Sequence, residues 1–279
     1  MNSLKIDKKS LELARKQFCL DIGLPWEEYE REPNRLVYIR KAVYGEESKL
    51  RLIKQARNYE GREDFFHAII CLGQLFLAVD EQLYDWAKAQ FENCAPEWFC
   101  AYGNLRRIDE MLRTYGYQIK DTHVYFLPES KEFVQKEEIA QSLEQPAFQW
   151  YDQEEILKFQ EGNRFTSAIC FSKTQPDMLA VASYKDGGTS CVEKPFDQSR
   201  MTGMAGVSAD GEYLWQIGIN VDEALRGQGL ASKLVKCMKE RVQAMGKVPF
   251  YGTSESHNIS KTVGLKAGFV PAWTEVYVK

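Results

Sequence analysis

The chain has 279 residues, of which 44% are hydrophobic and 27% charged, and its 40 acidic and 36 basic residues give a net charge of −4. These proportions are typical of a globular protein and exclude a disordered or fibrous chain. The charge balance also excludes the strongly basic surface of many nucleic-acid-binding proteins. The longest apolar runs (68–72 and 75–79) hold five residues each, whereas a membrane-spanning helix needs about 20, so no membrane segment is expected.

Cysteines and histidines are scattered along the chain. The seven cysteines form no C-x-x-C spacing and do not cluster with the three histidines, so neither a zinc site nor a disulfide framework is predicted. Residues 1–9 are not followed by an apolar core, and no signal peptide is expected. We therefore expect a cytoplasmic monomer or homodimer with reduced thiols, without a metal, a nucleic-acid partner or a membrane partner.

A charged segment bounded by Pro128 and Pro146 is typical of a surface connector. It divides the chain into an N-terminal α/β domain of unclear role, residues 1–135, and a second domain, residues 136–279.

The first half shows apolar spacing typical of alternating helices and strands. His67 and His123 each stand among apolar residues, and we interpret them as packed side chains rather than ligands. We see no group of residues in this half that could form a catalytic site. In chain order the predicted elements are a helix over 10–18, strands over 65–72 and 75–80, helices over 82–91 and 104–115 (the latter closed by Gly116), and a strand over 123–127.

The second half shows the same mixture of periods, so the fold class is α/β (α+β). In chain order the predicted elements are strands over 167–171 and 178–184, a turn at 186–188, a strand over 214–221, a helix from Arg226 to Gly246, a strand over 248–253, a helix over 258–267 and a strand over 273–278.

The stretch Arg226-Gly-Gln-Gly-Leu-Ala231 follows a strand and opens a helix, which is the geometry of an anion site. The first amides of a helix lack intrahelical partners, and the helix dipole adds positive charge there. Glycines allow a phosphate to approach the backbone, and an arginine supplies a fixed cation. The stretch predicts a pyrophosphate cradle. The alternative is a plain strand–turn–helix connection in which the glycines serve only the turn.

The spacing restricts the kind of phosphate ligand. It is not G-x-x-x-x-G-K-[ST], so a P-loop is not expected. It is not G-x-G-x-x-G either, because Ser232 stands where the third glycine would fall. A dinucleotide enzyme is further disfavoured because no series of parallel strands with helical crossovers is predicted.

Two motifs, in order and separated by a strand, resemble the GNAT superfamily of N-acetyltransferases. Arg226, Gly229 and Ala231, with Gly227 in addition, match its acyl-CoA motif, and the stretch 258–269 is similar to its second motif. The resemblance covers about residues 145–279. A closer resemblance is to a bacterial two-part subgroup, through the stretches 203–210, 215–219, 249–253 and 268–273, with weaker marks at 14–17 and 125–128.

The resemblance implies a GNAT-like acyl-CoA N-acyltransferase fold, in which a mixed, mostly antiparallel sheet is flanked by helices, with an additional N-terminal α/β domain. It also implies that the strand 214–221 separates from its neighbour and pairs with the pantetheine arm of acetyl-CoA. Asn258 has two interpretations, as a contact to that arm or as the N-cap of its helix. The implied CoA-binding residues are Ile219, Val221, Arg226, Gly227, Gln228, Gly229, Leu230, Ala231 and Asn258.

The implied reaction is direct attack of a primary amine, on a small molecule or peptide, on the thioester of acetyl-CoA. The sequence departs from the family where its acid and base often lie: Trp215 and Gln216 replace a glutamate, and Gly264 replaces a tyrosine. The alternative function is therefore a non-catalytic module that binds CoA or scaffolds a partner. Candidate catalytic residues near the motifs are Asp210, Glu212, Tyr251 and His257, each of which also has a purely structural interpretation.

Three aromatic residues flank the same region and have two interpretations. They either form a wall of the acceptor pocket or pack in the core, and core packing is the commoner role of large aromatic side chains. The three are Tyr213, Trp215 and Trp273.

Overall fold

The structure is a computed structural model that describes residues 5–42, 56–57, 63–130, 148–158, 165, 168–169, 177–185 and 198–278. Its helices are α1 (Lys8–Ile22), α2 (Trp26–Arg31), α4 (Glu81–Phe91), α5 (Tyr102–Arg113), α7 (Gln153–Ile156), α8 (Leu230–Ala244) and α9 (Asn258–Lys266). Its strands are β1 (Val37–Lys41), β2 (Glu63–Cys71), β3 (Gln74–Val79), β4 (Ile119–Pro128), β5 (Gln149–Asp152), β6 (Leu179–Tyr184), β7 (Met201–Ser208), β8 (Leu214–Val221), β9 (Val248–Ser254) and β10 (Phe269–Val278).

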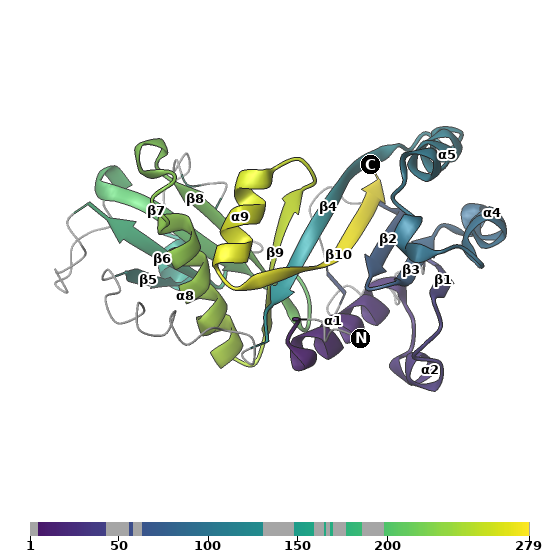
Figure 1. Ribbon diagram of the computed structural model, residues 1–279, viewed down its shortest axis with the longest axis horizontal. Coiled ribbons are helices and arrows are strands. Elements are labelled where there is room, and N and C mark those ends of the chain that lie inside the picture. Colours follow the sequence, from purple (N-terminus) through teal and green to yellow (C-terminus); the bar gives the residue numbers. More distant parts are fainter. Residues whose placement is uncertain are drawn as a thin grey trace.

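All ten of these strands belong to one sheet, in the order β1-β3-β2-β10-β4-β9-β8-β7-β6-β5 (Figure 1). Only β1 with β3 and β8 with β9 pair in parallel, and every other neighbouring pair among them is antiparallel. The predicted fold class, a mixed and mostly antiparallel sheet flanked by helices, is therefore confirmed.

The sheet does not follow the halves of the sequence. The last strand, β10, lies between β2 and β4, both of which come from the first half. In turn β4 lies between β10 and β9. The two segments predicted as domains thus share one continuous sheet, and the connector predicted between Pro128 and Pro146 lies mostly outside the described residues.

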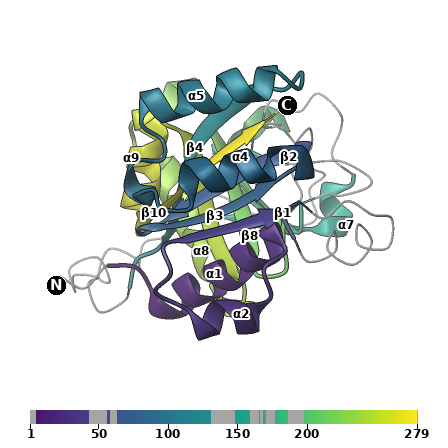
Figure 2. The same cartoon turned by 90° about the vertical axis from the view of Figure 1, so that its right-hand side faces the viewer.

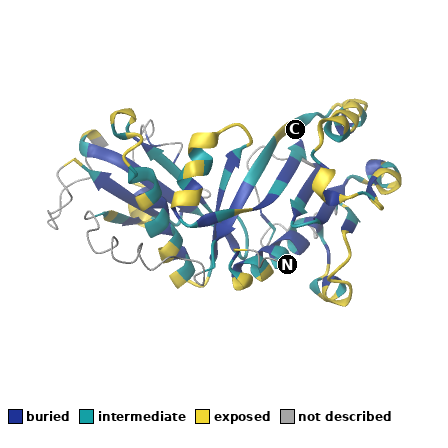
Figure 3. Cartoon of the chain, viewed as in Figure 1, coloured by how far each residue is buried: buried dark blue, intermediate teal, exposed yellow. Residues whose placement is uncertain are grey.

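Helices cover both faces of the sheet. On one face α1 and α2 pack against Phe76 and Trp273, and α7 packs against β6 and β7. On the other face α4 and α5 cover the β2–β3 end, and α8 and α9 cover β8 and β9 (Figures 1 and 2). The strands between these layers are largely buried (Figure 3).

Most predicted elements are present with small changes at their ends. The sequence analysis missed α2, α7, β1, β5 and β7. Strand β7 was missed because it contains glycine, a residue type that usually marks a turn. Glycine is needed at position 206 for close packing, because a Cβ there would lie 2.6 Å from the carbonyl oxygen of Ala168. Of the strand predicted over 167–171, only Ala168 and Ile169 are described and neither is in a strand; the turn predicted at 186–188 lies outside the described residues.

A buried ion cluster ties the first half to the last strand. The guanidinium of Arg57, fully buried, contacts Asp21 at 2.6 Å and Glu275 at 2.5 Å. Glu275 also accepts a hydrogen bond from Trp273 Nε1 at 2.6 Å and lies 3.1 Å from Nε2 of His67, which is packed as predicted. Burial opposes ionisation of Glu275, but Arg57 and the surrounding donors outweigh it and hold its pKa well below the ordinary value.

Replacing Arg57 with methionine is expected to destabilise the protein by about 3–5 kcal/mol, because two buried carboxylates lose their cation. Chemical denaturation of the variant measures this. The control is Arg106→Met, which breaks an exposed pair with Glu110 at 3.5 Å and is expected to cost less than about 1 kcal/mol. A loss at Arg57 no larger than that of the control would contradict the structural importance of the cluster.

Candidate functional site

Strand β9 changes its partner halfway along its length. Its first residues, Val248–Tyr251, pair in parallel with Leu214–Ile217 of β8. Its last residues, Tyr251–Ser254, pair with β4. Because β8 continues to Val221 without pairing with β9 beyond Ile217, the two strands form a fork, as the resemblance implied.

A cleft of about 560 Å³ occupies the fork and extends across β9 to β4 and β10. Its walls come from both halves of the chain, and its lining residues include no carboxylate. The described residues that line it are Lys120, His123, Tyr125, Gln216, Ile217, Gly218, Ile219, Tyr251, Gly252, Thr253, Ser254, His257, Ser260 and Tyr277.

The position of Tyr125 in the cleft depends on a glycine. A Cβ on Gly252 would lie 2.5 Å from a ring carbon of Tyr125, so the ring crosses β9 only because this residue has no side chain. The opposite face of the ring stacks on Trp273, with ring centroids 5.0 Å apart and an interplanar angle of 10°. The first half of the chain thus supplies a fixed aromatic wall.

The glycine loop before α8 has the geometry of an anion site. Gly227 and Gly229 both have φ of 81°, a left-handed conformation that glycine adopts without strain, and a Cβ on either would meet nothing within 4 Å. The first hydrogen bond of the 15-residue helix runs from the amide of Lys233 to the carbonyl of Gly229, so the preceding amides are available to a ligand. Arg226 is exposed and pairs with Glu223 at 3.4 Å. These residues fit a diphosphate group.

The other predicted CoA-binding residues lie around the fork and the loop. Ile219 lines the cleft, whereas the side chain of Val221 is buried against Gly203. Leu230 and Ala231 begin α8, and Gln228 donates a hydrogen bond to the carbonyl of Ala224 at 3.4 Å.

Asn258 is exposed and is the first residue of α9. The N-cap of this helix is His257, whose side chain makes no capping bond. The N-cap interpretation of Asn258 is therefore wrong, because the helix begins one residue earlier than that interpretation requires. A contact with the pantetheine arm stays a prediction.

Tyr251 lies at the branch point of the fork. Its hydroxyl is 2.6 Å from the hydroxyl of Ser260 on α9, and burial raises its pKa. A Cβ on Gly264 would lie 3.0 Å from the Tyr251 ring, so the small residue on α9 leaves room for it. A phenol on β9 therefore occupies the space beside the position where the family often carries its own tyrosine.

Asp210 and Glu212 are absent from the lining of the cleft. Asp210 accepts hydrogen bonds from the hydroxyl of Ser208 at 2.9 Å and from the amide of Gln216 at 3.1 Å, so its carboxylate holds the turn before β8. Burial raises its pKa to about 7. Glu212 lies 3.5 Å from the amine of Lys247.

The raised pKa of Asp210 predicts a pH dependence of stability. The folded state holds this proton between about pH 4 and 7, where the unfolded state releases it, so stability falls as the pH rises through that window. Three pKa units correspond to at most about 4 kcal/mol. Asp210→Asn, whose amide can satisfy both hydrogen bonds, is expected to lose this dependence. Urea unfolding of both proteins at pH 5 and pH 8 measures it, and an equal pH dependence in the two would contradict the assignment.

The structure also places His123 and the three aromatic residues whose role had two interpretations. His123, taken as a packed side chain, is half-buried and lines the cleft. Trp215 and Trp273, considered for the acceptor pocket, are buried in the core and do not line the cleft, and neither does Tyr213. No local signal in the sequence indicates the cleft residues on β4 and β10, because the order of the sheet decides which strands become neighbours.

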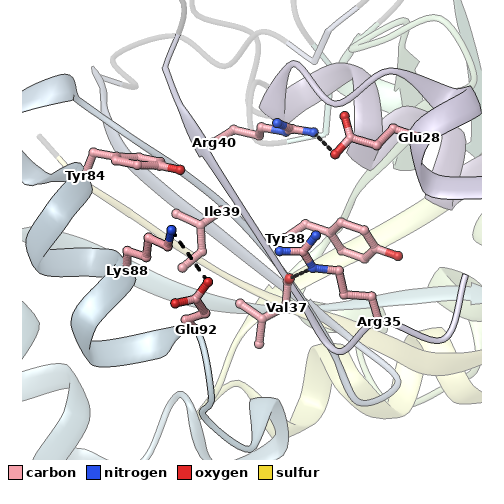
Figure 4. Close-up of a pocket in the computed structure, with 9 residues that line it drawn as sticks. All are labelled: Glu28, Arg35, Val37, Tyr38, Ile39, Arg40, Tyr84, Lys88 and Glu92. Carbon is pink, nitrogen blue, oxygen red and sulfur yellow. Dashed lines mark hydrogen bonds and ion pairs between the residues drawn. The ribbon is translucent and has the colours of Figure 1, made fainter. Parts of the chain in front are cut away.

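A second, smaller pocket of about 110 Å³ lies beside the edge strand β1, far along the sheet from the fork. Its charged side chains are mostly engaged with one another (Figure 4). Arg40 pairs with Glu28, Lys88 lies 3.7 Å from Glu92, and Arg35 donates to the carbonyl of Val37. Its size and internal pairing distinguish it from the cleft.

Neither a metal-binding cluster nor a membrane-spanning helix occurs in the part of the chain that the structure describes. No group of three or more His, Cys, Asp or Glu side chains there is arranged to hold a metal ion. None of the described helices has the length and apolar character needed to cross a membrane.

Comparisons with known proteins agree with this geometry. Residues 135–262 match the model of the Acetyltransferase (GNAT) family. Comparison with curated proteins gives no match. Similar solved structures include a GNAT-family acetyltransferase from Colwellia psychrerythraea (12% identity, 97% of this chain and 96% of that chain, TM-score 0.40) and a GCN5-related N-acetyltransferase from Kribbella flavida (16% identity, 61% and 62%, TM-score 0.36). The match to the GNAT family model thus covers residues 135–262, a little less than half of the chain.

Proposed function

We propose that the protein transfers the acetyl group of acetyl-CoA to a primary amine of a small molecule or peptide. One observation carries the proposal: the fork opens toward the end of β8 that leads into the glycine loop. A single extended ligand can therefore place its phosphates on the loop and its pantetheine arm between β8 and β9. Unpaired backbone groups along the free edge of β8 are the natural partners of the amides in that arm.

The reaction proposed is direct attack. The amine nitrogen forms a bond with the thioester carbonyl carbon, and backbone amides at the fork stabilise the oxyanion that develops. The carbon–sulfur bond then breaks, and the leaving thiolate takes a proton from the hydroxyl of Tyr251. Burial keeps this phenol protonated at neutral pH, and the hydrogen bond with Ser260 orients it.

Two measurements test the proposal. Isothermal titration with acetyl-CoA is expected to show binding, and release of free thiol is expected when amines, amino sugars or peptides are added. Tyr251→Phe is expected to bind acetyl-CoA as the wild type does and to lose about 100-fold in kcat. No binding at millimolar acetyl-CoA would overturn the proposal.

A second candidate, a non-catalytic CoA-binding module, is favoured by the absence of any carboxylate among the described residues that line the cleft. It predicts binding of acetyl-CoA without turnover of any amine in the panel. Product formation that depends on the protein would exclude it.

A further inference from the structure

We infer that His123, supplied by the first half of the chain, is the base that takes the proton from the acceptor amine. The inference rests on the proposed acetyl transfer and adds a catalytic residue to it. A primary amine is mostly protonated at neutral pH and must lose a proton before it can attack. The described lining of the cleft has no carboxylate to accept that proton, so the acceptor must be another side chain or solvent.

The phenols of the cleft are poor proton acceptors. Burial raises the pKa of Tyr251 and Tyr277, and it raises that of Tyr125 furthest. All three phenols therefore stay protonated at neutral pH. Two imidazoles, His123 and His257, are left among the described lining residues.

The structure distinguishes these two imidazoles. His257 is exposed and is the N-cap residue of α9. The ring of His123 is held between two aromatic rings, with centroids 6.0 Å from that of Tyr125 on its own strand and 5.9 Å from that of Tyr277 on β10. A fixed ring is what a positioned base requires.

The two nitrogens of His123 have different surroundings. Nε2 lies 3.7 Å from the carboxylate of Asp121, two residues earlier on β4 and so on the same side of the strand. A neighbouring carboxylate orients an imidazole and favours its protonated form. Nδ1 is buried and has no hydrogen-bond partner among the described residues. Because Nδ1 has almost no surface open to solvent, the nitrogen that accepts the proton is Nε2.

The proposed proton path is complete. An N–H bond of the ammonium breaks as its proton moves to the imidazole of His123, directly or through one water. The imidazolium passes this first proton to solvent, and the freed lone pair attacks the thioester carbon. As the carbon–sulfur bond breaks, Tyr251 protonates the departing sulfur as above, and the second proton lost by the nitrogen moves to His123. This second proton then returns to the Tyr251 phenolate, directly or through water, so the enzyme regains its starting state.

Several charged or titratable groups lie around His123. They come from each described element that packs near the ring. They are Lys120, Asp121 and Tyr125 on β4, Glu275 and Tyr277 on β10, and His257 between β9 and α9.

The test compares His123→Gln with the matched variant His257→Gln in the full chain. For each protein, acetyl-CoA affinity is measured by titration, and kcat is measured from pH 5.5 to 9 with an amine that the wild type accepts. We expect His123→Gln to bind acetyl-CoA normally, to lose at least 100-fold in kcat and to lose the acidic limb of the pH profile. His257→Gln is expected to keep that limb.

The outcomes separate this inference from the proposed function. If His123→Gln keeps its kcat and its acidic limb, or if the limb disappears in His257→Gln instead, His123 is not the base while acetyl transfer stands. If the wild type turns over no amine, the proposed function fails and the inference fails with it. Unfolding curves for each variant show whether a loss of kcat reflects a loss of fold, and the acidic limb of the pH profile gives a second readout that a folding defect does not mimic.

Discussion

Gly229→Tyr is expected to abolish acetyl-CoA binding, with a loss of affinity of at least 100-fold. The open space in front of Gly229, where a Cβ would meet nothing within 4 Å, is the space that the phosphates need. A tyrosine there fills it and holds the ligand away from the amides at the start of α8. Titration calorimetry with acetyl-CoA measures the effect.

Gly246→Tyr is the matched control. Gly246 follows the other end of the same helix, has φ of 77° and also has nothing within 4 Å of a Cβ, so both variants carry the same left-handed strain of about 1–2 kcal/mol. Gly246→Tyr is expected to bind acetyl-CoA as the wild type does. Equal losses of affinity in the two variants would mean that strain, and not phosphate contact, explains the effect.

Residues 136–279, produced alone, are expected not to fold. In the complete chain β10 pairs on one side with β2 and on the other with β4, and β9 also pairs with β4. Without the first half β10 has no neighbouring strand, and the unpaired edges promote aggregation. We expect no cooperative thermal transition by circular dichroism and no binding of acetyl-CoA.

The control for this experiment is the full chain cut once within residues 131–147. Both parts are then present, and the nicked protein is expected to stay associated on gel filtration and to bind acetyl-CoA. A cooperative transition and normal binding in the isolated fragment 136–279 would show that it is an independent domain.

The sequence predicted the elements whose signals are local. The glycine loop, α8 and the strands β8 and β9 were recognisable because their period and their turn residues lie within a few residues of one another. The positions of Gly227 and Gly229 followed from the same local logic.

The rest depends on contacts between distant parts of the chain. Nothing near His123 in the sequence indicates that β4 lies beside β9, so its place in the cleft could not be deduced. Gly252 and Gly264 give room to Tyr125 and Tyr251, but a glycine in a sequence does not state which ring lies over it. Asp210 was taken for a catalytic candidate because it precedes the motif strand, whereas its hydrogen bonds tie that turn together.

The central place of β10 has a consequence for how the protein is made. Its strand partners begin at Glu63 and Ile119, and the contact between Arg57 and Glu275 spans 218 residues of chain. Contacts of such long range slow folding, because the entropy of closing the loop is lost before the contact forms. A chain synthesised only as far as β9 still has a gap between β2 and β4, which the ten-residue strand β10 fills. We therefore expect newly made chains to need protection from aggregation until β10 has been synthesised.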